Sequence, residues 1–238
     1  MKNVSFSLYY FSIGILFIIL EDFHLFYPAF AVKILIIPAL MLYYHVQVKN
    51  RYNPGHYLIL SGLFFSWAGD ILLHLAGRNI QLPINRELFF LIGLGCFMLT
   101  CLFYIAAFNI KRGRNPILNR RAYMPILVFA YGAGLIWLIY NNLGEEKIYV
   151  MVFLFVTLVM FLAALNRHGK VNGVSYMLVA FGAFFFTASV SMLGIKIYYE
   201  KFDFARIFIM SSYVLAQYLI ALGFIKQDAS TTIKSKAK

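Results

Sequence analysis

Apolar residues fill eight long stretches of the chain, and short polar stretches separate them. An α-helix needs roughly 20 mostly apolar residues to cross the hydrocarbon core of a bilayer. The pattern therefore predicts membrane-spanning helices at residues 4–20, 29–48, 57–76, 87–109, 122–140, 147–165, 173–194 and 204–225. We expect an all-α fold in which a polytopic helical bundle occupies residues 1–226 and a polar cytoplasmic tail occupies residues 227–238.

Turn-forming residues mark several of the breaks between these stretches. They are Asn53-Pro54-Gly55, Arg114-Asn115-Pro116 and Asn141-Asn142-Leu143-Gly144. Because the connections are short, we expect consecutive helices to be antiparallel neighbours.

The distribution of basic residues predicts the orientation of the bundle. Most of the 21 Lys and Arg residues lie in one alternating set of segments, near residues 2, 49–51, 111–121, 167–170 and 226–238. Cytoplasmic loops carry the excess of Lys and Arg in membrane proteins. We therefore expect both ends of the chain to be cytoplasmic and the protein to be integral and multi-pass, in the inner (cell) membrane if the source is bacterial.

Composition supports the membrane assignment and argues against other classes. The chain is 62% hydrophobic and 13% charged, whereas soluble domains carry about 25% charged residues. Its net charge of +12 is spread over loops without a contiguous basic face, so we expect no nucleic-acid partner. The two cysteines, Cys96 and Cys101, lie about 8 Å apart along one helix, too far for a disulfide. No metal-binding spacing or dinucleotide motif is present, and we expect neither a metal ion nor a cofactor.

Two ionisable residues stand out inside the predicted spans. Asp70 lies well within the third span, and Lys33 lies about one turn inside the second. A charged side chain at mid-helix costs roughly 2.5–3.5 kcal/mol on insertion. Because the second and third helices run in opposite directions, both residues lie in the outer half and at depths that allow contact. Either Asp70 is a carboxylate in an enclosed polar pocket, or the two form a structural ion pair, with snorkelling as the alternative for Lys33.

Several other polar residues recur at helical spacing and share faces of their helices. They are Ser66, Asp70 and His74 in the third span, Cys101 and Tyr104 in the fourth, and Tyr213 and Gln217 in the last. We expect Asp70 to line a polar cavity inside the bundle, with Lys33, Tyr104, Tyr213 or Gln217 among its neighbours.

Beyond these patterns, the sequence resembles the YhhN family of membrane lysoplasmalogenases. Residues 60–70 are similar to an apolar run of the family that ends in Gly-Asp, here Gly69-Asp70. Residues 89–93 and 97–106 resemble its fourth helix, and residues 213–220 resemble its closing Tyr-x-x-Ala-Gln-x-Leu-Ile. Lys33 opens the second span as in the family, although Ile34 follows where a proline is usual. The likeness extends over nearly the whole chain.

The resemblance implies hydrolysis of the vinyl ether bond of lysoplasmalogens to a fatty aldehyde and a glycerophospho-alcohol. Such chemistry needs an acid that protonates the enol ether, stabilisation of an oxocarbenium-like cation, and a water molecule. We expect Asp70 to be catalytic and seven residues to contact a lysophospholipid or similar amphiphile. These seven are Lys33, Ser66, His74, Cys101, Tyr104, Tyr213 and Gln217.

Two positions depart from the family pattern. Cys101 stands three residues before Tyr104, where the resembling motif has a histidine, and Val190 stands where the seventh helix has an aspartate. Ser189 and Ser191 flank Val190, but neither is a carboxylic acid. The alternatives are therefore a catalytically silent relative that binds lysolipids, and a small membrane transporter with Lys33 and Asp70 along its path. The sequence leaves the oligomeric state open.

The predicted topology is testable with single cysteines introduced into the connections. A cysteine at Asn115 and one placed after Gln227 should react with reagents from the cytoplasmic side, and a cysteine at Asn142 from the opposite side. Labelling of the Asn115 and Asn142 positions from the same side would contradict the eight-helix arrangement.

Overall fold

Eight α-helices, all long and apolar enough to cross a membrane, form the chain that the structure describes. The structure is a computed structural model that describes residues 2–77, 86–110 and 123–236, with side chains over 5–77, 86–110 and 123–227. The helices are α1 (Lys2–Asp22), α2 (Phe26–Val48), α3 (Pro54–Ala76), α4 (Arg86–Asn109), α6 (Tyr123–Ile139), α7 (Lys147–Leu165), α8 (Gly173–Tyr198) and α9 (Ala205–Lys236). Short 3₁₀ turns, η1 (Tyr140–Asn142) and η2 (Gly144–Glu146), join α6 to α7. The predicted integral, multi-pass membrane architecture is therefore confirmed.

Helix ends differ from the predicted ones mainly at α9. This helix continues to Lys236, whereas hydropathy predicts its end at residue 225, because hydropathy follows apolarity and a helix can continue through polar residues. At the start of α3, Asn53 caps the helix, since its Oδ1 accepts a hydrogen bond from the Gly55 amide at 2.8 Å. The predicted turn at Arg114-Asn115-Pro116 lies outside the described residues.

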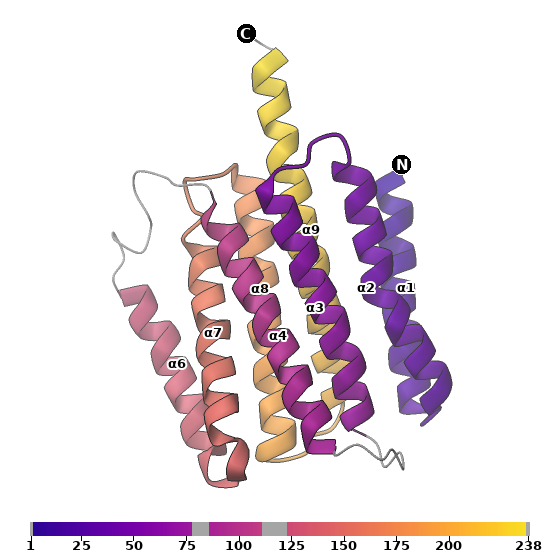
Figure 1. Cartoon of the computed structure of the whole chain (residues 1–238), viewed down its shortest axis with the longest axis vertical. Helices are drawn as coiled ribbons and strands as arrows, with labels where there is room; N and C mark the ends of the chain where they lie inside the picture. Colours follow the sequence, from indigo (N-terminus) through magenta and orange to yellow (C-terminus); the bar gives the residue numbers. More distant parts are fainter. Residues whose placement is uncertain (1, 78–85, 111–122, 237–238) are drawn as a thin grey trace.

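The helices form a bundle in which α1 begins and α9 ends at the same side (Figure 1). The chain neighbours α1 and α2, α2 and α3, α3 and α4, α6 and α7, α7 and α8, and α8 and α9 all pack together. The helix α4 packs on α7, and α6 lies at the edge of the bundle against α7 and α8. Helix α9 also contacts α1, α2 and α3, so it occupies a central place.

Glycines bring the closest helix pairs together. A Cβ atom at Gly182 of α8 would lie 2.7 Å from Ile220 Cγ1 and 3.0 Å from the Ala216 carbonyl oxygen on α9. At Gly62 of α3, a Cβ atom would clash with the ring of Tyr104 on α4. Small residues at such contacts allow helix backbones to approach each other inside membranes. Gly62 therefore provides the space in which the Tyr104 ring reaches the centre of the bundle.

One buried cation joins three helices near the end at which α9 leaves the bundle. Arg167, between α7 and α8, is only 2% exposed. Its Nη2 donates to Gln227 Oε1 at 2.7 Å and to Ser175 Oγ at 3.1 Å, and its guanidinium lies 4.4 Å from the centre of the Phe224 ring. Burial lowers the pKa of Arg167 to about 10, so the side chain remains protonated at neutral pH.

Replacing Arg167 by methionine should destabilise the bundle. The change keeps an unbranched apolar stem but removes the donor to Gln227 and Ser175, at a cost of about 1–3 kcal/mol for each buried group left unsatisfied. Thermal unfolding of the detergent-solubilised protein should have a lower midpoint by several degrees. The matched control is Arg51→Met at an exposed position on the α2–α3 connection, and equal midpoints for the two variants would contradict this account.

Candidate functional site

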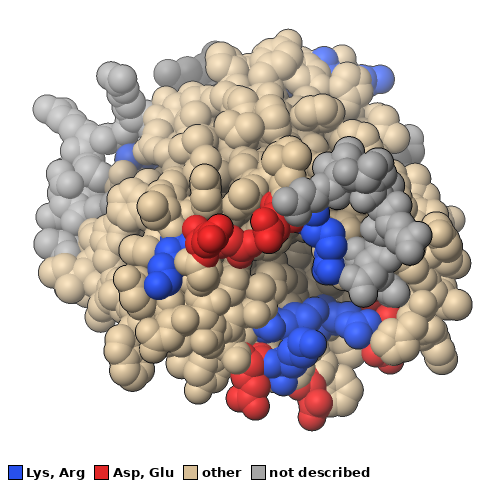
Figure 2. All heavy atoms as spheres, turned by 60° about the horizontal axis from the view of Figure 1, so that its bottom comes forward, with Lys and Arg blue, Asp and Glu red and all other residues tan. Residues whose placement is uncertain are grey.

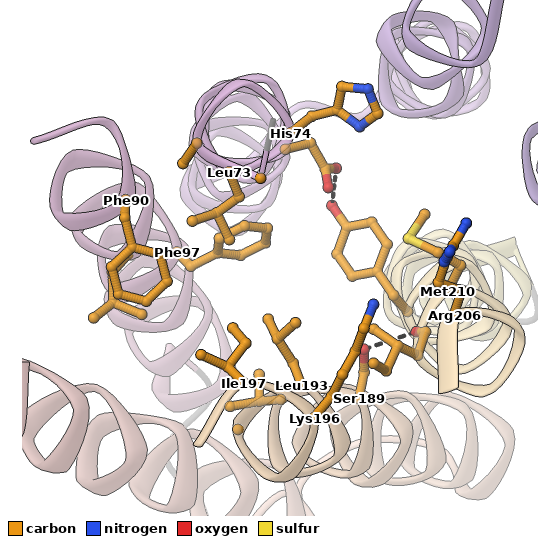
Figure 3. A pocket seen from close by; sticks show the side chains of 18 of the residues that line it. Leu73, His74, Phe90, Phe97, Ser189, Leu193, Lys196, Ile197, Arg206 and Met210 are labelled. Carbon is orange, nitrogen blue, oxygen red and sulfur yellow. Dashed lines mark hydrogen bonds between the residues drawn. The ribbon is translucent and has the colours of Figure 1, made fainter. Parts of the chain in front are cut away.

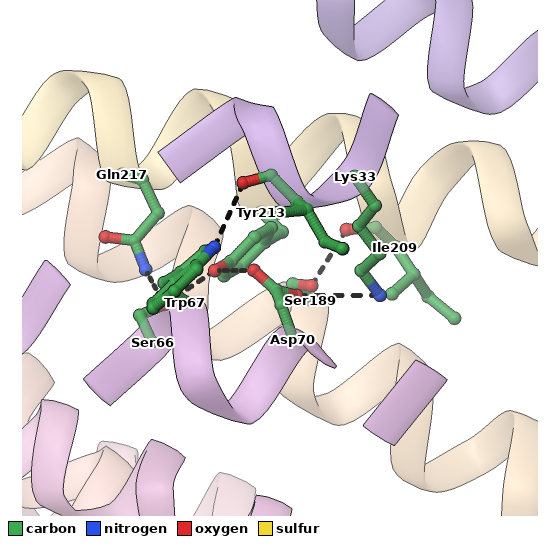
Figure 4. Close-up of polar contacts among 9 residues, drawn as sticks. Lys33, Ser66, Trp67, Asp70, Ser189, Ile209, Tyr213 and Gln217 are labelled. Atoms are coloured by element: carbon green, nitrogen blue, oxygen red, sulfur yellow. Dashed lines mark hydrogen bonds and ion pairs between the residues drawn. The ribbon is translucent and has the colours of Figure 1, made fainter. Parts of the chain in front are cut away.

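Asp70 lies inside the bundle and meets partners from two other helices. Its side chain is largely buried, with the whole residue 6% exposed. The Tyr213 hydroxyl of α9 donates to Asp70 Oδ2 at 2.5 Å, and Lys33 Nζ of α2 lies 3.6 Å from Oδ1 (Figure 4). One turn before Asp70 on α3, Trp67 Nε1 donates to the Ile34 carbonyl of α2 at 3.0 Å, and this hydrogen bond links the two helices. The structure thus brings Lys33 and Tyr213 to the carboxylate, two of the neighbours expected from the sequence.

A chain of four buried hydrogen bonds ends on Asp70. Tyr213 gives its one hydroxyl hydrogen to Asp70, so the Ser66 hydroxyl, 2.6 Å from Tyr213 Oη, must donate to Tyr213. Gln217 Nε2 donates in turn to Ser66 Oγ at 2.7 Å, and the Tyr104 hydroxyl donates to Gln217 Oε1 at 2.5 Å. All four bonds therefore point toward Oδ2, which acts as an acceptor, whereas Oδ1 faces Lys33 Nζ at 3.6 Å.

A pocket of about 1480 Å³ lies beside Asp70, and it opens at the end of the bundle that faces the reader in Figure 2. Asp70, Lys33, Tyr213 and Ser189 all line it. Ser189 is held in place because its hydroxyl donates to the Ile209 carbonyl at 2.8 Å. The polar groups converge on one region of an otherwise apolar cavity, as they do in many ligand sites.

The apolar part of the pocket extends away from Asp70 toward α4, α6 and α7. Its lining includes Phe90, Phe97, Leu135, Ile139 and Phe153. In Figure 3, Phe90 and Phe97 lie on the side of the cavity opposite Arg206 and Met210 of α9. The pocket is therefore amphipathic, with one polar side and one side suited to a hydrocarbon chain.

Charged side chains surround the mouth of the pocket. Figure 2 shows a hollow in this end of the bundle, with basic side chains in and beside it and acidic ones near its rim. The charged lining residues other than Lys33 and Asp70 are Glu21, Arg86, Glu87, Glu146, Lys196, Lys201 and Arg206. One of these carboxylates, that of Glu146, accepts a hydrogen bond from the Tyr198 hydroxyl.

The residues selected from the sequence divide into three groups. Lys33, Asp70, His74 and Tyr213 line the pocket. Ser66, Tyr104 and Gln217 lie behind Tyr213 and form the hydrogen-bond chain described above. Cys101 is fully buried, and its Sγ lies 3.7 Å from Thr157 Oγ1 on α7.

His74 packs among aromatic rings at the edge of the pocket. Its ring stacks on Phe26 and Phe30, with centroid distances of 4.9 and 5.2 Å. Gly69, next to Asp70, serves helix packing, because a Cβ atom there would lie 2.7 Å from the Phe97 ring of α4.

Val190, the second position that departs from the resembling pattern, faces the cavity. Val190 lines the pocket together with Ser189, whereas Ser191 donates to the Thr187 carbonyl and accepts from Tyr131. A carboxylate at position 190 would therefore border the same cavity as Asp70.

Sequence reasoning did not select the basic residues of the mouth as site residues. Lys196 and Lys201 lie between two predicted spans and Arg206 lies at the start of the last one, although Lys196 is seven residues from Ser189, and Arg206 seven residues from Tyr213. Seven residues are about two helical turns, so each pair shares a helix face, and that spacing was the available signal. Among the described residues, no three His, Cys, Asp or Glu side chains are grouped to hold a metal ion.

Comparison with known proteins identifies the family. The model of the YhhN family matches residues 28–224, so the chain belongs to the YhhN family. The matched region runs from the first turn of α2 to Phe224 of α9 and includes Lys33, Asp70, Tyr104, Tyr213 and Gln217. No curated protein and no solved structure matches the chain.

Proposed function

From its membership of the YhhN family and the geometry of the pocket, we propose that the protein is a lysoplasmalogenase-like membrane hydrolase. It cleaves the vinyl ether bond of a lysoplasmalogen and releases a fatty aldehyde and a glycerophospho-alcohol. The family is associated with lysoplasmalogenase activity. The observation that carries the proposal is Asp70, a buried carboxyl group on the polar side of an amphipathic pocket of about 1480 Å³.

Asp70 has the surroundings of a general acid. Its Oδ2 accepts from Tyr213, which fixes the orientation of the carboxyl group, and the proton is carried on Oδ1. Asp70 delivers this proton to the vinyl carbon remote from the ether oxygen, and the adjacent carbon becomes part of an oxocarbenium ion. Lys33, 3.6 Å from Oδ1, stabilises the carboxylate formed in this step, and that carboxylate stabilises the cation.

The same carboxylate then acts as the base. Water attacks the cationic carbon and gives its proton to Asp70, and the resulting hemiacetal separates into the aldehyde and the free glycerol hydroxyl. Glycosidases divide comparable steps between two carboxyl groups. Here the other carboxylates among the described pocket residues, Glu21, Glu87 and Glu146, belong to the mouth, so Asp70 serves in both steps.

A second function is favoured by one specific observation. Val190 lines the pocket at the position where the resembling family segment has an aspartate, which leaves the inner part of the pocket with one carboxyl group. A catalytically silent protein that binds lysolipids would keep the amphipathic cavity without a second acid. This candidate differs from the hydrolase in turnover and not in binding.

The hydrolase proposal predicts that Asp70→Asn abolishes release of aldehyde. Loss of a general acid typically lowers the rate by about 10²–10⁴, and asparagine preserves the size of the side chain. The measurement is aldehyde release from a lysoplasmalogen by the purified, solubilised protein. The control is Glu145→Gln, at an exposed position outside the pocket, which should leave the rate unchanged, and an Asp70→Asn rate close to wild type would exclude the role of Asp70.

The missing carboxylate at position 190 generates a separate prediction. If the single carboxyl limits turnover, Val190→Asp should raise the rate of aldehyde release, because a second group can then activate water while Asp70 protonates the ether. Thermal unfolding of the variant verifies that the bundle tolerates the new acid. Lysolipid binding without turnover in wild type would establish the silent relative, and absence of both would contradict both functions.

A further inference from the structure

Three basic side chains line the mouth of the pocket without an acidic partner in the described part of the chain. Lys196 comes from α8, Lys201 from the α8–α9 connection and Arg206 from the first turn of α9. Lys33, the other lysine of the pocket lining, lies 3.6 Å from Asp70 Oδ1. Arg206 donates through Nη1 to the Glu21 backbone carbonyl at 2.7 Å, so a neutral oxygen and not a carboxylate holds it.

The mouth has an excess of positive charge. Apart from Lys33 and Asp70, the charged lining residues are four cations and three carboxylates: Arg86, Lys196, Lys201 and Arg206, and Glu21, Glu87 and Glu146. The cations therefore outnumber these carboxylates by one, and Glu146 already accepts a hydrogen bond from the Tyr198 hydroxyl. Lys196 and Arg206 are both partly buried, where like charges repel more strongly than in bulk water. An anion in the mouth would offset this repulsion.

Lys196 and Arg206 lie on the same side of the cavity. In Figure 3, Lys196 extends from α8 into the cavity toward the side on which Arg206 of α9 lies. An arginine and lysines around one space are a common arrangement for phosphate, since arginine donates two parallel hydrogen bonds and lysine supplies a mobile point charge.

The distance between the basic side chains of the mouth and Asp70 matches the length of a glycerophosphate group. Arg206 precedes Tyr213, the partner of Asp70, by seven residues on α9, and these span roughly 10 Å of helix. In a lysoplasmalogen, seven bonds separate the phosphorus from the vinyl carbon that Asp70 protonates, a reach of about 8 Å at the rise of an extended chain. The flexible side chains of Lys196 and Arg206 cover the difference.

We propose that Lys196, Lys201 and Arg206 form an anion site that binds the phosphodiester of the lysolipid head group. Binding there directs the vinyl ether to Asp70 and the hydrocarbon chain to the apolar side lined by Phe90 and Phe97. This proposal rests on the proposed function for the identity of the lipid. The anion chemistry itself follows from the three cations.

The test compares two saturated ether probes that cannot undergo vinyl ether hydrolysis. Hexadecyl glycerophosphocholine carries the phosphodiester, and hexadecyl glycerol has the same chain without it. The full-length protein in detergent should bind the phosphorylated probe more tightly than the other. Lys196→Gln combined with Arg206→Gln should weaken binding of the phosphorylated probe by about 10- to 100-fold, the range for lost charged hydrogen bonds, and leave hexadecyl glycerol unaffected.

Two further variants keep the result interpretable. Lys147→Gln removes a positive charge at the same end of the bundle, from a side chain that lies over the Tyr140 ring and outside the pocket lining, and it should bind both probes as wild type does. Lys201→Gln, at an exposed position, should weaken the phosphorylated probe even if the double variant fails to fold.

The outcomes separate this inference from the proposed function. Equal affinity of wild type for the two probes, or an unchanged preference in both Lys196/Arg206 and Lys201 variants, would overturn the anion site. Competition by inorganic phosphate as strong as that by the phosphorylated probe would indicate a free-anion site and overturn the lipid source. A phosphate preference that persists in Asp70→Asn while aldehyde release is absent in wild type would support the anion site and contradict the hydrolase.

Discussion

A carboxylate within a membrane-spanning helix must find polar partners inside the protein, because lipid offers none. Asp70 meets this requirement through Tyr213 and Lys33, on α9 and α2. Each of these buried polar groups needs hydrogen-bond partners of its own. Tyr213 therefore bonds to Ser66, Ser66 to Gln217, and Gln217 to Tyr104. Four helices are thereby held in register around one side chain.

The packing of the bundle is adapted to this polar chain. Gly62 leaves space for the Tyr104 ring between α3 and α4, and Gly182 lets α8 approach α9, the helix that carries Tyr213 and Gln217. Ser189 of α8 meets the α9 backbone at Ile209 and completes the polar side of the cavity. The pocket is thus a space beside a rigid hydrogen-bonded core, and an amphiphile bound there would meet Asp70 in a fixed orientation, which the proposed protonation requires.

The fold and part of the site follow directly from the sequence. The eight spans were predicted from hydropathy, and the contact of Lys33 with Asp70 from their depths on antiparallel helices. Rotation of each helix about its axis was not predictable, because lipid-facing and interior faces are both apolar here and periodicity does not separate them. For that reason Ser66, Tyr104 and Gln217 were selected correctly as interior polar residues, but only the structure shows that they lie behind Tyr213. Only the structure shows, likewise, that Cys101 packs against Thr157. The end of α9 at Lys236 was missed because hydropathy does not follow a helix through polar residues. The place of Lys196 and Arg206 in the pocket lining was missed because hydropathy does not show which way a charged side chain near a helix end faces.

The central claim is that Asp70 is a carboxyl group which carries a proton within a pocket that an amphiphile enters. Dicyclohexylcarbodiimide is an apolar reagent that modifies carboxyl groups in their protonated form, so it tests this claim without requiring turnover. Mass spectrometry of the labelled protein should locate an adduct on Asp70, and hexadecyl glycerophosphocholine should suppress it, because the lipid occupies the space beside the carboxyl. An absence of adduct at Asp70, or an adduct that the lipid leaves undiminished, would contradict the account.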